Sequence, residues 1–330
     1  MKRFTLIIFT LLSINISAQT FFGSEPFAHT YSIVAKDTVT GEMGVAVQSH
    51  WFSVGTLVSW GESGVGVVAT QSFINPSFGL RGLELLKSGL SPQQVVDSLI
   101  ATDEGRDVRQ LAILDVQGRV AAYTGKNCIQ DAGHIVGENF SVQANLMKSN
   151  KVWTAMAEAF KNSKGRLAER LLTTLEAAQQ QGGDIRGKQS AAILVVKGKS
   201  SGKVWADRLV DLRVDDSKEP LKEIGRLLKV HRAYEHMNNG DLAIEHGDMR
   251  LAMNEYSAAE EMFPQNEEMK FWHAVTLANT GNVKESLPYF KEVFNKNSDW
   301  LILLPRLVDA KLLNVDEKSL KTILNLMKRM

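Results

Sequence analysis

Two hydroxyl side chains, Thr30 and Ser32, lie two residues apart in a segment of aromatic and β-branched residues. Successive side chains of a strand point to opposite faces, so both hydroxyls should share one face of a strand over residues 30–36. A hydroxyl on a rigid strand can act as a nucleophile once a base accepts its proton. Thr30 and Ser32 are therefore candidate catalytic residues, and the alternative is that both merely line a strand.

Other polar side chains stand at or just after the ends of predicted strands. Gln71 and Asn75 are candidate catalytic groups, because amides placed there could donate to the oxyanion of a tetrahedral intermediate. Gln48 and Thr70 hold comparable positions and are candidates for substrate binding. The same side chains could instead satisfy backbone groups at the strand ends.

A glycine-rich connection at residues 182–190 precedes another predicted buried strand. It could bring Asp184, Arg186 and Gln189 to the rim of a site, or it could be a solvated loop. His134 is the histidine best placed to join them. The sequence has no zinc-ligand pattern and no phosphate-binding loop, so we expect no metal and no cofactor.

Charged residues cluster at the end of the last predicted strand, where Asp211, Arg213, Asp215 and Asp216 occur together. A surface ion-pair network is favoured there over a site for a cation or a substrate amine. The chain has a single cysteine, Cys128, so it forms no internal disulfide. We expect a buried, inert thiol, because no group that would lower its pKa is evident.

The amino terminus has the features of a secretory signal. Lys2 and Arg3 precede an apolar run over residues 4–12, and small residues lead to a cleavage site expected after Ala18. The apolar run is too short to span a bilayer, so we expect an exported protein, periplasmic or secreted, with no stable membrane anchor. A buried N-terminal helix is the alternative. Residues 19–29 would then be a linker or propeptide.

Charge and length limit the remaining possibilities. The chain has 330 residues, which is comfortable for two domains. Its formal charge is +1, and removal of the two positive charges of Lys2 and Arg3 lowers it to −1. This balance, without a dense basic run, gives no reason to expect a nucleic-acid partner.

The predicted elements do not alternate as in a parallel α/β fold. Strands are expected at 30–36, 43–50, 64–71, 108–115, 119–123, 138–143, 190–197 and 209–214, and helices at 75–89, 91–102, 151–163 and 165–181. Groups of strands separated by pairs of helices indicate two stacked, largely antiparallel sheets flanked by helices, an α+β architecture.

From about Leu221 the strand signals end and a 34-residue self-similarity follows. Ala252, Tyr256 and Ala259 match Ser286, Phe290 and Val293, and Gly247-Asp248 and Pro264 match Gly281-Asn282 and Ser298. The period and spacing resemble the tetratricopeptide repeat, which implies a protein-binding helical domain, with residues 301–330 as a third, degenerate unit. An unrelated helical bundle is the alternative, and a homodimer is compatible with either.

Several separate motifs in the first two thirds of the chain occur in a characteristic order. They lie at residues 29–35, 40–49, 64–71, 75–79, 81–86, 182–184, 186–191 and 211–216. Together they resemble the bacterial DUF1028 family, largely uncharacterised proteins with an N-terminal-nucleophile (Ntn) hydrolase-like fold. The resemblance implies a four-layer αββα sandwich over residues 30–230. The 34-residue repeat then implies an all-α, TPR-like domain over residues 231–330.

An N-terminal nucleophile uses its own α-amino group, with a pKa near 8, as the base. The resemblance therefore implies that Thr30 acts only if the chain is cut between His29 and Thr30, with Ser32 the second candidate. The expected function is hydrolysis of an amide bond in a small molecule or peptide. The alternative is an inactive binding or scaffolding protein that uses its TPR-like helices.

Overall fold

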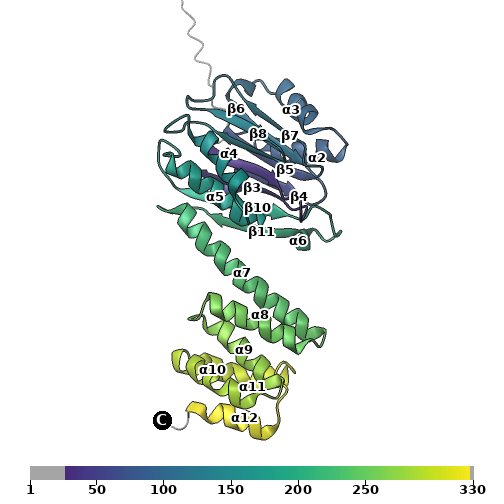
Figure 1. Cartoon of the computed structure of the whole chain (residues 1–330), viewed down its shortest axis with the longest axis vertical. Helices are drawn as coiled ribbons and strands as arrows, with labels where there is room; N and C mark the ends of the chain where they lie inside the picture. Colours follow the sequence, from purple (N-terminus) through teal and green to yellow (C-terminus); the bar gives the residue numbers. More distant parts are fainter. Residues whose placement is uncertain (1–26, 328–330) are drawn as a thin grey trace, which may run out of the picture.

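The computed structural model describes residues 27–327, and the signal and most of the linker predicted above lie outside them. It has an α/β region and a helical region joined by one long helix, α7 (Figure 1). The elements of the α/β region are β1 (Phe27–Ala28), β2 (Thr30–Lys36), β3 (Met43–Ser49), α1 (Gly55–Val58), β4 (Ser59–Glu62), β5 (Gly66–Phe73), α2 (Ser77–Lys87), α3 (Pro92–Ala101), η1 (Arg106–Val108), β6 (Arg109–Asp115), β7 (Val120–Thr124), β8 (Gly133–Gly137), β9 (Phe140–Ala144), α4 (Val152–Asn162), α5 (Leu167–Gln180), β10 (Ser190–Val196), α6 (Val204–Asp207) and β11 (Arg208–Val214). Those of the helical region are α7 (Pro220–Glu245), α8 (Met249–Met262), α9 (Glu267–Asn279), α10 (Val283–Lys296), α11 (Asp299–Asp309), α12 (Glu317–Leu324) and η2 (Asn325–Met327).

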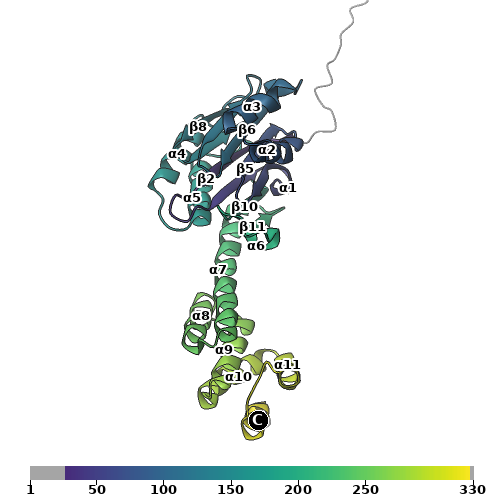
Figure 2. The ribbon, with the colours of Figure 1, turned by 90° about the vertical axis from the view of Figure 1, so that its right-hand side faces the viewer.

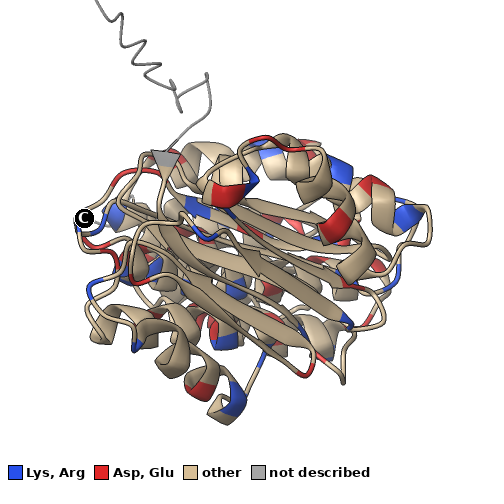
Figure 3. Ribbon diagram, turned by 90° about the horizontal axis from the view of Figure 1, so that it is seen from above, with Lys and Arg blue, Asp and Glu red and all other residues tan. Residues whose placement is uncertain are grey.

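Two antiparallel sheets form the α/β region, as the strand grouping predicted. One sheet has the order β11-β10-β3-β2-β9-β8, and the other β1-β5-β6-β7, with β4 also paired to β5. Side chains from both sheets meet in a common apolar cluster, so the sheets pack face to face. Charged residues lie mainly on the helices and loops around the strands (Figure 3).

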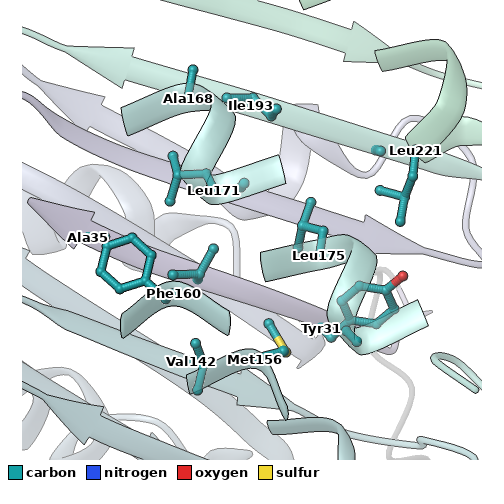
Figure 4. Packing of buried hydrophobic residues seen from close by; sticks show 14 of the residues in the cluster. Tyr31, Ala35, Val142, Met156, Phe160, Ala168, Leu171, Leu175, Ile193 and Leu221 are labelled. Carbon is teal, nitrogen blue, oxygen red and sulfur yellow. The ribbon is translucent and has the colours of Figure 1, made fainter. Parts of the chain in front are cut away.

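Alternation along β2 decides which side chains enter the space between the sheets. Tyr31 and Ile33 belong to a cluster formed with α4, α5 and the start of α7, on the outer face of their sheet (Figure 4). Val34 belongs to the cluster between the sheets. Thr30 and Ser32 share the parity of Val34, so both hydroxyls point between the sheets, on one face as predicted.

Helices cover the outer face of each sheet. Phe160 of α4 and Leu171 of α5 pack on the six-stranded sheet, whereas Phe78 of α2 and Leu99 of α3 pack on the other. The α3 helix begins at the predicted serine: the Ser91 hydroxyl accepts from the backbone of Gln94, whose side chain accepts from the backbone of Ser91. Figure 2 shows the two helix layers on opposite sides of the strands.

Most predicted elements are confirmed within a few residues, but several short ones were missed. The hairpin of β6 and β7 turns around Gly118, as expected. Neither α1 nor β4 was predicted, because four residues hold barely one period of any pattern. The β8–β9 hairpin was also missed in part, since glycine and histidine in β8 weaken its strand signal.

The α7 helix crosses the predicted domain boundary at residue 230 without a break. Its first half contributes Leu221 and Leu228 to the core of the α/β region. Its second half contributes Ala233 and Met237 to a separate cluster with α8. The buried contacts of α7 therefore change from one region to the other between residues 228 and 233.

The residues matched by the 34-residue repeat are buried at equivalent places. Ala252, Tyr256 and Ala259 of α8, and Ser286, Phe290 and Val293 of α10, are all at most 1% exposed. Two helices approach closely at Gly240, where an added Cβ would lie 2.9–3.1 Å from the ring of Tyr256. The C-terminal part is thus a helical region built on paired helices, with small residues where two helices meet.

Candidate functional site

The chain crosses from one sheet to the other immediately before Thr30. Ala28 pairs with Ser72 of β5, whereas Thr30 pairs with Ser49 of β3 in the opposite sheet. His29 is the crossing residue, and all three residues from Ala28 to Thr30 are at most 1% exposed. The peptide bond between His29 and Thr30 is therefore held in a fixed, buried position.

Two side chains hold the carbonyl oxygen of His29. The Ser49 hydroxyl donates to it at 2.6 Å, and Nη2 of Arg186 donates at 2.8 Å. Asp184 orients this guanidinium through a 2.7 Å ion pair and also accepts from the backbone N–H of His50. A hydroxyl and a cation directed at one carbonyl oxygen form the arrangement that stabilises an oxyanion.

The Thr30 hydroxyl is engaged on the same side. Its Oγ1 donates to the carbonyl oxygen of Ala28 at 2.6 Å. In this state it has no neighbouring base, because its own nitrogen belongs to a peptide bond. Loss of the residues before Thr30 would remove that acceptor and leave an α-amine on the same residue.

Ser32 lies deeper between the sheets and is bonded only to amides. Its hydroxyl donates to Oε1 of Gln71 and accepts from Nε2 of Gln143, each at 2.6 Å. A carboxamide oxygen is too weak a base to take up the serine proton. The surroundings of Ser32 therefore suit a structural hydroxyl better than a nucleophile.

Gln110 connects these groups into one buried network. Its Oε1 accepts from Gln71 at 2.6 Å and from Nδ2 of Asn145 at 2.9 Å. Its Nε2 donates to the hydroxyl of Thr124 at 2.9 Å. Asn145 in turn accepts from Nδ1 of His29 at 2.8 Å, so the network reaches the crossing residue.

Two histidines at the ends of the network are held neutral. Burial lowers the pKa of His29, despite its bond to Asn145, and burial lowers the pKa of His134. The hydroxyl of Thr124, which accepts from Gln110, also lies 2.8 Å from Nδ1 of His134, so this histidine is joined to the network.

Backbone strain flanks the network. Ser72 and Leu146 adopt the left-handed conformation, with φ of 74° and 58°. They directly follow Gln71 and Asn145, two donors of the network. Such residues cost about 1–3 kcal/mol each and persist where the surroundings impose them, often at functional sites.

The structure brings six of the predicted residues to this place and leaves four elsewhere. Thr30, Ser32, Gln71, Asp184 and Arg186 lie around the crossing, and His134 is at its margin. Those elsewhere are Gln48, Thr70, Asn75 and Gln189.

Three of these four residues form hydrogen bonds to other groups, away from Thr30. Asn75 accepts from the backbone and hydroxyl of Ser77 at the start of α2, and its own carbonyl oxygen accepts from Thr70. Thr70 lies two residues after Val68 in β5, so its side chain points to the same outer face of the sheet, toward helices α2 and α3. Gln189 donates to Asp216 near the surface.

Gln48 lies on the opposite face of β3 from Ser49. It is fully buried, and its amide makes no hydrogen bond to the described residues. The strand-end position predicted from the sequence is correct, but the alternation of β3 turns this side chain away from Thr30.

Ser49, Gln110, Gln143 and Asn145 were not predicted. All four are fully buried, although each lies in or directly after a strand. The available signal was polar alternation in buried strands, as in Ser141, Gln143 and Asn145 of the β9 segment. A strand that is buried on both faces yet carries polar residues at every second position indicates a polar interior.

Other predictions concern groups outside this site. Asp211 pairs with Arg208 and Arg213, which confirms an ion-pair network, whereas Asp215 accepts from Ser53. Cys128 is partly buried, and burial raises the pKa of its thiol. Within residues 27–327 no three potential ligands gather to hold a metal ion, and no helix is long and apolar enough to cross a membrane.

The two face-to-face antiparallel sheets and their buried polar network define a mixed α/β protein with a candidate site at a strand crossing. The chain belongs to the family of unknown function DUF1028, whose model matches residues 30–224. It is similar to the crystal structure of protein SPO2555 from Silicibacter pomeroyi, described as DUF1028, with 32% identity and a TM-score of 0.56. That alignment covers 61% of this chain and 85% of the other. In all, 20 chains of solved structures match, and no curated protein does.

Proposed function

We propose that this protein is an exported Ntn-type amidohydrolase whose nucleophile is Thr30. The observation that carries the proposal is the carbonyl of His29, held by Ser49 and Arg186 at the peptide bond that must break to release Thr30. The substrate is an amide of a small molecule or peptide. Hydroxyl and guanidinium donors can stabilise the oxyanion that forms in such chemistry.

Two further observations support the Ntn-like αββα fold. Helices cover the outer face of each of the two stacked sheets, which gives the expected layers. The match to the family model begins at Thr30, so the family resemblance starts at the proposed nucleophile.

Processing would use the geometry around His29. The Thr30 oxygen attacks the carbonyl carbon of His29, the bond from this carbon to the Thr30 nitrogen breaks as that nitrogen takes up the hydroxyl proton, and an ester to Oγ1 with a free amine remains. Water then hydrolyses the ester, leaving a carboxylate on His29 and a free α-amine on Thr30. Ser49 and Arg186 would stabilise the negative charge that forms on the carbonyl oxygen.

Turnover would repeat this acyl transfer on a substrate. The neutral α-amine of Thr30 takes the hydroxyl proton, and the oxygen attacks the substrate amide. The amine returns the proton to the leaving nitrogen, and water hydrolyses the acyl ester. The space vacated by Ala28 and His29 would admit the substrate, because Thr30 is fully covered while they are in place.

Acyl trapping tests this proposal. The mature protein is incubated with a panel of amino-acid and short-acyl anilides, and covalent adducts are mapped by mass spectrometry. We expect an acyl group on Thr30, its loss in Thr30→Ala, and its retention in Ser32→Ala. Adduct formation or turnover that survives in Thr30→Ala would refute the assignment.

We also propose that the helical region is TPR-like and binds a protein partner. Support comes from the equivalent burial of the repeated residues and from the Gly240 contact with Tyr256. This part of the proposal corresponds to the alternative function, a binding protein, and does not require catalysis.

A further inference from the structure

A cavity lies on the open side of the sandwich, away from Thr30. On one side of the molecule the edge strands β7 and β8 approach each other, whereas on the other β4 and β11 leave a groove. This groove holds a cavity of about 400 Å³, between β4, α2, β10 and the α6–β11 segment. Figure 2 shows α1, β10, β11 and α6 along this side. None of the residues that carry the Thr30 site lines the cavity.

The lining of this cavity combines an apolar surface with two serine hydroxyls that make no hydrogen bond to the described residues. Leu83 of α2 and Leu194 of β10 contribute to the apolar part. Ser59 and Ser63 also line it, and their buried hydroxyl oxygens have no hydrogen-bond partner among the described residues. Ser63 is only 8% exposed. A flat apolar group with one polar hydrogen would satisfy both features.

An aromatic side chain of matching chemistry stands on the rim of the same groove. Trp205 of α6 is 81% exposed, although its neighbour Val204 lines the cavity. Val204 and Leu80 on the rim are exposed as well, at 70% and 57%. The indole of tryptophan is a flat apolar body with one N–H donor, and a cavity of this volume can hold it.

The charges around the groove permit two copies to approach. Asp211 is paired with both Arg208 and Arg213. Glu62 is paired with Lys87, and Asp207 with Lys197. The rim is thus a mixture of both signs rather than a field of one sign, so self-association meets no general repulsion.

We propose that the groove binds a second copy of this chain, with Trp205 of each copy inserted into the cavity of the other. A projecting group and a complementary cavity on one face form a self-complementary patch, which a two-fold axis can satisfy twice. The indole N–H would donate to one of the unpartnered serine hydroxyls. The proposal does not depend on the function proposed for Thr30.

The area of this contact sets how much of the surrounding rim must also be buried. A buried tryptophan contributes about 150–250 Å². A standard interface buries about 800 Å² per partner, so two tryptophans need the surrounding rim as well. Central aromatic anchors carry most of the binding energy in such contacts. We expect a dimer that dissociates in the micromolar range.

Sedimentation of the full chain over a concentration series tests the proposal. We expect a monomer–dimer equilibrium, and at least a tenfold weaker association for Trp205→Ala. The control is Leu312→Ala, a side chain that is 53% exposed in the helical region and should leave the equilibrium unchanged. A wild-type chain that stays monomeric at about 100 μM, or Trp205→Ala associating as strongly as wild type, would overturn the proposal.

A mixing experiment tests the geometry itself. Thr56→Trp blocks the cavity from its lining while Trp205 remains, so neither this variant nor Trp205→Ala should form homodimers. When the two variants are mixed, Trp205 of the Thr56→Trp protein can still enter the open cavity of the Trp205→Ala protein. We therefore expect a weak heterodimer. If Thr56→Trp folds poorly, Leu80→Glu blocks the rim instead. Absence of the heterodimer with both partners folded would contradict the insertion of Trp205.

Discussion

Thr30 and Ser32 share a strand face but differ in what surrounds them. Ser32 is hydrogen-bonded to the side chains of Gln71 and Gln143, neither of which is basic enough to deprotonate its hydroxyl. Thr30 stands next to a peptide bond whose carbonyl oxygen receives donors from Ser49 and Arg186. In the proposed mechanism the nucleophile is therefore Thr30, and its activation depends on cleavage of that bond.

The first prediction concerns the donors to the His29 carbonyl. Ser49→Ala removes one of two groups that would stabilise the oxyanion, so release of Thr30 should slow by about 100-fold or more. The rate is followed by intact mass of newly made protein. Ser141→Ala is the matched control, because Ser141 is equally buried between the sheets but bonds Gln143 instead. Equal processing of the two variants would contradict the role given to Ser49.

The second prediction concerns the half-buried imidazole of His134. Its pKa is lowered in the folded protein, so the unfolded chain takes up this proton first as the pH falls below about 6.5. The stability that depends on neutral His134 is therefore present above that pH and lost below it. His134→Gln should flatten the decline in the free energy of unfolding between about pH 7 and pH 5. Both proteins should carry Thr30→Ala so that His29, whose pKa is also lowered, stays attached. An unchanged slope in denaturant titrations would count against this account.

The sequence allowed part of the site to be predicted, and the missing part has a physical reason. Thr30 was found at the start of a predicted strand, Gln71 at the end of another, and Arg186 in a glycine-rich connection. Gln110 and Asn145 were missed, because only the pairing of strands from two sheets brings them within hydrogen-bond distance of the others. Asn75 was selected for its strand-end position, yet its local hydrogen bonds to Ser77 at the start of α2 account for it.

At the scale of elements, the strand crossing at His29 positions the site and the helix pairs build the C-terminal region. β1 has two residues, yet it fixes the chain against β5 before it enters β2. So short an element has no sequence pattern of its own and is visible only in the pairing of the sheets. The helix pairs were predictable because their contacts repeat at a fixed period.

The third prediction tests the close contact between helices α7 and α8 at Gly240. Gly240→Ala places a methyl group 2.9–3.1 Å from the ring of Tyr256, and such overpacking costs about 1–3 kcal/mol. Gly225→Ala in the same helix meets only the flexible end of Leu172 at 3.2 Å, so gained helix propensity should offset the contact. Thermal unfolding should show a lower midpoint for the first variant alone. Equal midpoints would show that helix α7 has room beside Tyr256.

At the scale of the whole molecule, one continuous helix belongs to two cores. The buried residues of α7 up to Leu228 lie in the α/β core, and those from Ala233 lie in the helical cluster. The two clusters share no residue, so each region should be able to keep its own packing if the helix between them is interrupted.

The fourth prediction uses this division. Lys229 is exposed, so Lys229→Pro removes a helical hydrogen bond without emptying a core, at a local cost of about 3 kcal/mol. We expect processing at His29–Thr30 to continue unchanged while small-angle scattering shows a wider distribution of shapes. Lys229→Ala is the control for loss of the side chain. If Lys229→Pro abolished processing, the two regions would form a single cooperative unit.

The most direct test of the account is the intact mass and N-terminal sequence of the mature protein from the exported fraction. We predict a chain that begins at Thr30, with a free α-amine beside its hydroxyl. The Ser49→Ala protein should begin further upstream, because its processing is slowed. A mature wild-type protein that begins at Gln19 and keeps His29 would contradict N-terminal-nucleophile chemistry at Thr30.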